Sequence, residues 1–154
     1  MARKFLIEPE IISNILGGKR KPNLTYDELK TQAENNGVGE LYNKVCQGLT
    51  PTIFWTTTTQ SSITFTGTGT SRRAIFALLP GQSNPDEGLK FKVYVTRLAE
   101  FFSLEQQNVS NLLPNLTTNW EEEWSGLVGE GYFKTEAEVT HFLRQLNEVR
   151  RELL

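Results

Sequence analysis

The sequence predicts an α+β fold in which N-terminal helices pack on an antiparallel sheet of about four or five strands and an amphipathic C-terminal helix closes the chain. Three observations support this prediction. Helical patterns with clear capping signals lie near both ends of the chain. Strand patterns fill the middle, and their connections are too short for crossover helices, so the strands should be antiparallel. At 154 residues, we expect one globular domain spanning 1–154.

Three helices are predicted in the first third of the chain. Residues 8–16 place aliphatic side chains on one face and precede two glycines, which favour a helix end. Thr25 begins a second helix, because Glu28 follows three residues later and completes a capping box. Asn36 with the glycine after it ends that helix, and a third is predicted over residues 38–48.

A threonine-rich region separates these helices from the rest of the chain. Residues 50–70 contain ten threonines together with isoleucine, phenylalanine and tryptophan, which all favour strands. Within this region apolar residues alternate with threonine, so we expect Thr64 and Thr66 to face solvent. The predicted strands cover residues 52–58, 62–66, 72–79 and 89–95, and the last should lead into a helix near Thr96.

The last third of the chain is predicted to close the fold. Residues 120–133 contain two tryptophans, three consecutive glutamates and three glycines, and should form one or two short strands. Thr135 and Glu138 form a second capping box. The helix that follows, from Glu136 to about Glu152, has apolar residues at helical spacing along one face.

The segment from Val95 to Pro114 resembles the helix-turn-helix of bacterial repressors in its apolar and small positions. We expect two short helices that meet at Ser103, with Ala99 as the small residue where they cross. The exposed face of the second helix would carry amide side chains, which can make paired hydrogen bonds to adenine. That helix has no lysine or arginine, and Glu105 would approach the phosphates. Ordinary packing of two amphipathic helices is therefore the competing interpretation.

The net charge of −2 gives no overall attraction to nucleic acid. The charge is uneven, since residues 1–30 carry six basic and four acidic side chains whereas residues 121–154 carry four and eight. Local basic clusters would therefore have to bind the phosphate groups. The predicted nucleic-acid-binding surface combines such clusters with the amides of the second helix: Lys19, Arg20, Lys21, Arg72, Arg73, Gln106, Gln107 and Asn111.

Two other binding functions fit the sequence. Trp120 and Trp124 flank three glutamates, and such an acidic aromatic segment suits a protein partner better than a nucleic acid. The threonine-rich strands lie beside Arg72 and Arg73, so they offer hydroxyl and guanidinium donors to a nucleotide or another small molecule.

Groups suited to catalysis are scarce in the sequence. Cys46 and His141 are the only cysteine and histidine, and neither a metal-ligand spacing nor a phosphate-binding glycine loop occurs. No secretory signal and no apolar run of membrane-spanning length is visible, so we expect a cytoplasmic location and no membrane contact. The sequence thus predicts a non-catalytic binding module without cofactor or metal, whose partner is a nucleic acid, a protein or a small molecule.

Overall fold

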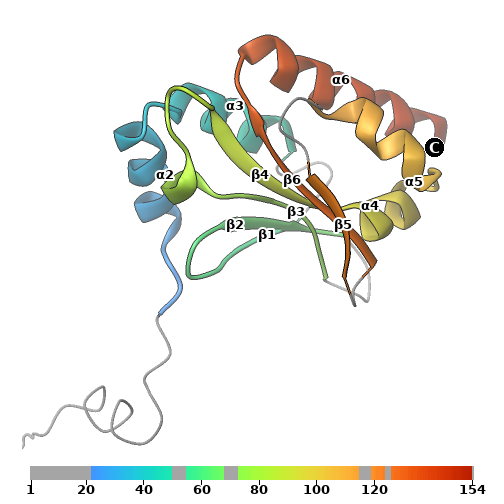
Figure 1. The fold of residues 1–154 in the computed structure, drawn as a ribbon, viewed down its shortest axis with the longest axis horizontal. Helices are drawn as coiled ribbons and strands as arrows, with labels where there is room; N and C mark the ends of the chain where they lie inside the picture. The colour runs from blue at the N-terminus through green and yellow to red at the C-terminus, as the bar shows by residue number, and fades with distance from the viewer. Residues whose placement is uncertain (1–21, 50–54, 68–72, 115–118, 124–125, 154) are drawn as a thin grey trace, which may run out of the picture.

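A computed structural model of the chain describes residues 22–49, 55–67, 73–114, 119–123 and 126–153. These residues form five α-helices, two short 3-10 turns and six strands (Figure 1). The α+β class is confirmed, with six strands rather than four or five. In chain order the elements are α2 (Tyr26–Asn35), α3 (Gly39–Leu49), β1 (Trp55–Thr58), β2 (Ile63–Thr66), β3 (Ala74–Leu78), η1 (Pro80–Gln82), β4 (Leu89–Tyr94), α4 (Val95–Phe102), α5 (Gln106–Val109), η2 (Ser110–Leu112), β5 (Asn119–Glu123), β6 (Gly126–Phe133) and α6 (Glu136–Leu153).

All six strands belong to one antiparallel sheet with the order β1-β2-β3-β4-β6-β5. The first four strands follow one another as a meander, as the short connections predict. The chain then passes through α4, α5 and η2 before it adds β5 and β6 (Figure 1). The sheet has six strands because residues in the 120–133 region form both of the short strands that the sequence allowed, β5 and β6.

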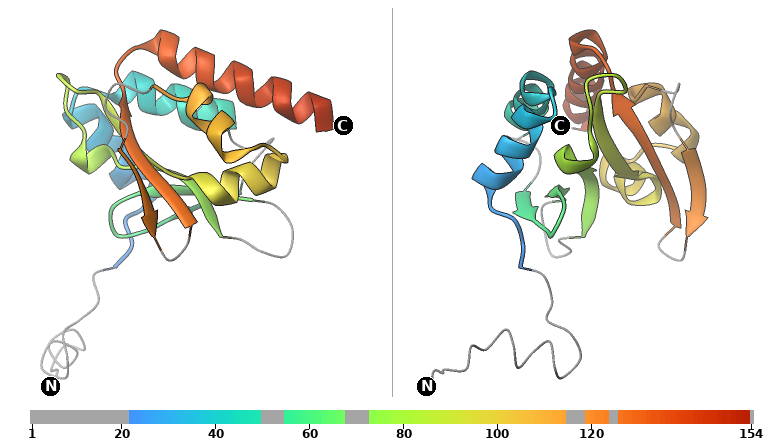
Figure 2. Two further views of the ribbon diagram at one scale, coloured as in Figure 1. Left: turned by 45° about the vertical axis from the view of Figure 1, so that its right-hand side comes forward. Right: turned by 60° about the vertical axis from the view of Figure 1, so that its left-hand side comes forward.

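The core lies between one face of the sheet and the helices. Phe76 of β3 is central, since its ring centroid lies 5.8 Å from that of Phe91 and 5.0 Å from that of Phe142 on α6. Phe65 and Phe133 complete this cluster, and all five rings are fully buried. Helices α3 and α6 lie beside each other over this face (Figure 2). The N-terminal helices that the structure describes therefore pack on the sheet as predicted.

The threonines of β2 differ from the prediction. Thr64 and Thr66 lie on the face opposite the phenylalanines, yet they are only 6% and 5% exposed. Their hydroxyls bond within the protein, to Ser62 Oγ at 3.3 Å and to the carbonyl oxygen of Trp55 at 3.5 Å. Strand β2 is an inner strand with neighbours on both sides, which accounts for part of this enclosure. These two hydroxyls are therefore not available to a ligand.

The predicted helix starts at Thr25 and Thr135 are confirmed. Thr25 Oγ1 accepts from the Glu28 backbone N–H at 3.1 Å, and Thr25 N–H donates to Glu28 Oε1 at 2.8 Å. Thr135 and Glu138 make the same pair of bonds at the start of α6, both at 3.2 Å. The predicted helix over residues 8–16 lies outside the described residues. No helix in the described ranges is long and apolar enough to span a membrane.

Candidate binding surfaces

The two helices predicted around Ser103 are present as α4 and α5. Ser103 ends α4 in the left-handed conformation, with φ of 56°, which makes the corner without a glycine. Helix α5 has only four residues and continues as the 3-10 turn η2. Val109 and Leu112 are buried, and the Asn111 carbonyl oxygen lies 3.0 Å from Nε2 of His141 on α6. The second helical segment is therefore a single turn that packs against the core.

Two of the predicted nucleic-acid-binding residues, Arg73 and Gln106, lie near the start of α4. Thr96 Oγ1 donates to Gln106 Oε1 at 2.7 Å, while Arg97 Nη1 donates to the Ala74 carbonyl oxygen at 2.9 Å. Arg73 is the residue immediately before Ala74, and it is exposed. Arg73 and the α5 amides thus flank the N-terminal turn of α4. Exposed Gln107 and Asn111 lie on α5 and η2, whereas Lys19, Arg20, Lys21 and Arg72 lie outside the described residues.

Two basic residues that sequence reasoning missed join this region. Arg97 Cζ lies 4.7 Å from the centroid of the Tyr94 ring, and Lys92 Nζ lies 5.2 Å from it. With Arg73 they place three cations near the junction of β4 and α4. A shallow hollow of about 500 Å³ lies beside α4, and Glu100 and Glu105 line it. Gln106 and Gln107 also line this hollow, so an anion held by the cations would meet these amides beside two carboxylates. We will call Arg73, Lys92, Tyr94 and Arg97 the α4 cluster.

A second surface lies at the β1 edge of the sheet. Trp55 is 51% exposed and Tyr26 is 49% exposed, and in the described part of the chain no other large hydrophobic residue is so exposed. The Tyr26 hydroxyl lies 3.1 Å from Thr56 Oγ1. Thr56 pairs with the core residue Phe65, so its side chain is on the helix face, and Trp55 points to the opposite face. The two aromatic rings therefore flank one strand from both faces of the sheet.

An apolar groove of about 380 Å³ adjoins this strand. Tyr42 and Cys46 of α3 and Ile63 of β2 supply its apolar wall. Asp27 and Lys30 of α2 also line the groove, and neither forms an ion pair with any described residue. We will call this groove, together with strand β1, Tyr26 and Trp55, the β1 surface.

Strand β1 has an open edge. It pairs with β2, and the structure describes no strand on its other side. The Thr59 N–H donates to the Ser62 carbonyl oxygen at 2.9 Å, so Thr59 and Ser62 stand at a hydrogen-bonded position of the ladder, while the Thr59 carbonyl oxygen accepts from the Leu24 N–H at 2.9 Å just beyond the end of β1. Because such pairs alternate along an antiparallel ladder, Thr57 directs its backbone groups toward β2, whereas Thr56 and Thr58 direct theirs outward. The open edge therefore presents two backbone N–H donors and two carbonyl acceptors.

The thiol in the groove is suited to packing rather than to chemistry. Burial raises the pKa of Cys46 from its ordinary 9.0 to about 12, and a hydrogen bond with Tyr42 opposes part of that rise. Burial also raises the pKa of Tyr42. Since the thiolate is the nucleophilic form, Cys46 is a poor nucleophile near neutral pH. His141 hydrogen bonds with the Asn111 carbonyl, so the cysteine and the histidine have separate partners.

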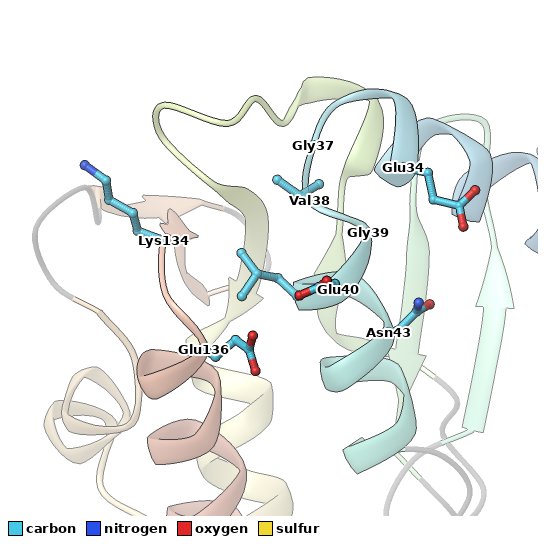
Figure 3. Close-up of a pocket in the computed structure, with 9 residues that line it drawn as sticks. Glu34, Gly37, Val38, Gly39, Glu40, Asn43, Lys134 and Glu136 are labelled. Carbon is cyan, nitrogen blue, oxygen red and sulfur yellow. The ribbon is translucent and has the colours of Figure 1, made fainter.

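A polar hollow of about 660 Å³ lies between the α2–α3 turn and the start of α6 (Figure 3). Glu34, Glu40, Glu136 and Lys134 line it, and all four side chains are exposed. Lys44 Nζ lies 3.6 Å from Glu136 Oε1 at its border. Water screens such exposed charges, so the hollow offers at most a weak contact to a cation. Among the described residues no group of three or more acidic, histidine or cysteine side chains could hold a metal ion.

The predicted protein-binding tryptophans lie at the other edge of the sheet. Trp120 of β5 pairs with Gly129 of β6, and its ring occupies the space that a side chain at Gly129 would fill. Trp120 is half-buried and packs against the core. Trp124 lies outside the described residues. Their role in binding a protein stays a prediction.

Comparisons of this chain with protein-family models, with curated proteins and with solved structures gave no match. The case for a function therefore depends on the geometry of the β1 surface and the α4 cluster.

Proposed function

We propose that this chain is a non-catalytic binding module whose β1 surface takes up a strand from a protein. The observation that carries the proposal is the meeting of an open strand edge, an apolar groove and two exposed aromatic rings. Exposed apolar residues are ordinary when scattered, but here one exposed ring lies on each face of an open strand edge, and Tyr26 also lines the groove. Aromatic residues are also the commonest strong contributors to binding at protein interfaces.

The geometry matches recognition by strand addition. A peptide strand on the open edge would hydrogen bond to the outward backbone groups of Thr56 and Thr58. Its side chains would alternate between the two faces of the sheet. One set would contact Tyr26 and the groove, and the other set would contact Trp55. The expected partner segment is therefore extended, with apolar residues at every second position.

A peptide-display selection tests this proposal. Random ten-residue peptides displayed on bacteria would be selected on the wild-type chain and counter-selected on a Trp55→Lys variant. We expect enriched peptides to alternate apolar and polar residues, and to slow amide hydrogen exchange at Thr56 and Thr58. A Glu121→Lys variant, which places the same residue on the opposite edge strand, should bind these peptides as the wild type does. Selection of peptides that bind both lysine variants equally would contradict the proposal.

A second candidate function is nucleic-acid binding at the α4 cluster. The observation that favours it is that Arg97 connects the neighbourhood of Arg73 to the strand that carries Lys92. Guanidinium and ammonium groups would hold phosphates, and the amides of Gln106, Gln107 and Asn111 would add polar contacts. Lys19, Arg20, Lys21 and Arg72 stay predicted phosphate contacts that lie outside the described residues. Few bases would be read, because α5 is a single turn.

Fluorescence anisotropy with a single-stranded oligonucleotide tests this second function. Three phosphate contacts predict a log–log salt slope of about −2, so affinity should fall about fifteenfold between 50 and 200 mM salt. An Arg73→Gln, Lys92→Gln double variant should bind at least tenfold more weakly and with a shallower slope. Lys134→Gln, at the polar hollow, is the matched control. Wild-type affinity at low salt no better than that of an unrelated acidic protein would exclude this function.

A further inference from the structure

We infer that the protein strand taken up by the β1 surface belongs to a second copy of this chain, so that two β1 strands pair across a two-fold axis. The inference depends on the proposed function, because it names the partner of the same surface. It would join two six-stranded sheets into one continuous sheet, with the helices of both copies on the same face.

The backbone of β1 is self-complementary. Its outward residues are Thr56 and Thr58, and they stand symmetrically about Thr57. When a two-fold axis passes beside Thr57, Thr56 of each copy lies opposite Thr58 of the other. All the outward N–H and carbonyl groups of this stretch are then satisfied in antiparallel hydrogen-bonded pairs. The symmetry of the pairing requires no sequence other than the one present.

The side chains of β1 favour the same pairing. The strand contains no charged residue and no proline, which are two of the features that protect an exposed edge, although its length of four residues limits the pairing it can offer. Trp55 would lie diagonally across from Thr57 of the second copy, which is an aromatic and β-branched contact of the kind that stabilises sheets. Burial of Trp55 in this way would remove one of the two exposed aromatic rings from water.

The charges at the groove are also self-complementary. Asp27 and Lys30 are exposed on α2, and neither is ion-paired within the described part of its own chain. A two-fold axis at β1 brings the two α2 helices toward each other on the helix face. Asp27 of each copy would then approach Lys30 of the other, and two equivalent ion pairs would form. A strand from an unrelated protein would not bring these two complementary charges with it.

Size-exclusion chromatography with light scattering tests the pairing on the full chain. We expect a dimer at 100 μM that dissociates on dilution. Thr57→Lys places two like charges at the axis and should weaken the dimer at least tenfold, while circular dichroism shows an unchanged fold. Asn108→Lys adds the same charge on exposed α5 and should leave the dimer intact. In a Cys46→Ser background, Thr57→Cys should give an intermolecular disulfide on mild oxidation, since closely spaced non-hydrogen-bonded pairs suit that bond.

Each alternative result separates this inference from the proposed function. A chain that is monomeric at every concentration, yet binds selected peptides at β1, would overturn the self-pairing and keep the strand-uptake function. A monomer that becomes dimeric only after removal of residues 1–21 would also overturn it, because the chain's own N-terminal segment would then be the occupant. A dimer insensitive to Thr57→Lys would place the contact elsewhere. A monomer that binds no peptide would overturn both.

Discussion

The two edge strands of the sheet are β1, with the sequence Trp-Thr-Thr-Thr, and β5, with the sequence Asn-Trp-Glu-Glu-Glu. Each edge strand has a tryptophan, but Trp55 is half exposed and Trp120 packs across Gly129 against the core. Acidic residues on β5 discourage the addition of another strand. Uncharged β1 has no such protection and lies beside an apolar groove. The two edges of one sheet thus differ in what they can accept.

The difference shows that a tryptophan in a strand takes its role from the residue opposite it. Trp120 pairs with Gly129, and the absence of a side chain there leaves room for the indole ring on the core face. Trp55 pairs with Thr66 on the other face, where the edge of the sheet leaves its ring partly in water. Composition alone makes the two tryptophans equivalent, and only the register separates them.

The largest effect is expected from Gly129→Ala, which would break the β5 side of this comparison. The new methyl group would collide with the Trp120 ring, which cannot stay where it packs. Overpacking of this kind costs about 1–3 kcal/mol, and displacing a large ring should put this variant near the upper end. Urea denaturation followed by circular dichroism would measure the loss of unfolding free energy.

Gly39→Ala is the matched control for that variant. It makes the same chemical change at the first residue of α3, where the methyl group meets mainly the flexible side chain of Glu34. We expect its unfolding free energy to stay within about 0.5 kcal/mol of the wild type. Equal stabilities for Gly129→Ala and Gly39→Ala would show that Trp120 is not held by the space at Gly129.

A pH dependence should arise on the β1 side. In the unfolded chain the Cys46 thiol ionises near pH 9, whereas in the folded chain burial raises its pKa to about 12. The folded state therefore keeps the proton in this interval and the unfolded state loses it. The unfolding free energy should fall on the order of 1 kcal/mol per pH unit above pH 9, and this contribution should be constant below about pH 8. Cys46→Ala should flatten part of that slope in urea titrations between pH 8 and 10.7, and an unchanged slope would contradict it.

Short-range signals explain which parts of the fold were predictable. The starts of α2 and α6 depend on the bonds of Thr25 to Glu28 and of Thr135 to Glu138, which span three residues, so the sequence alone reveals them. The alternation in β4 is equally local. Strand order is not local, and it decides that β1 is an edge and that Thr64 is enclosed between two neighbours.

The candidate sites were harder to predict for the same reason. Arg97 belongs to the α4 cluster because its side chain reaches the Ala74 carbonyl, which lies 23 residues away in the chain. The β1 surface combines Tyr26 with Trp55 only after α2 has packed beside the sheet. Neither contact has a spacing that a sequence pattern could reveal. The basic and aromatic residues were visible as types, but their grouping required the fold.

Substitutions at the two helix N-caps also test the comparison between the edges, and the loss of unfolding free energy expected from them is smaller. Thr25→Ala and Thr135→Ala each remove one side of a capping box, and each should cost about 1 kcal/mol of unfolding free energy. Of these two capping residues, only Thr25 is adjacent to Tyr26, whose hydroxyl contacts Thr56 of the edge strand. Thr25→Ala should therefore also weaken association at β1 in light scattering, whereas Thr135→Ala should not. Equal loss of association in both variants would point to general destabilisation.

The smallest change in stability is expected when the acidic protection of β5 is removed. Glu121 is exposed, and a Glu121→Thr, Glu123→Thr double variant gives this strand an edge closer in composition to that of β1. Surface changes of this type alter the unfolding free energy by about 0.5 kcal/mol or less. Association should nevertheless change, because two unprotected edges allow dimers to join end to end. Light scattering should show species larger than a dimer at high concentration, and combining the double variant with Thr57→Lys should limit assembly to pairing through β5. If the double variant assembles no further than the wild type, then the inward position of Trp120, rather than the charge, keeps the β5 edge closed.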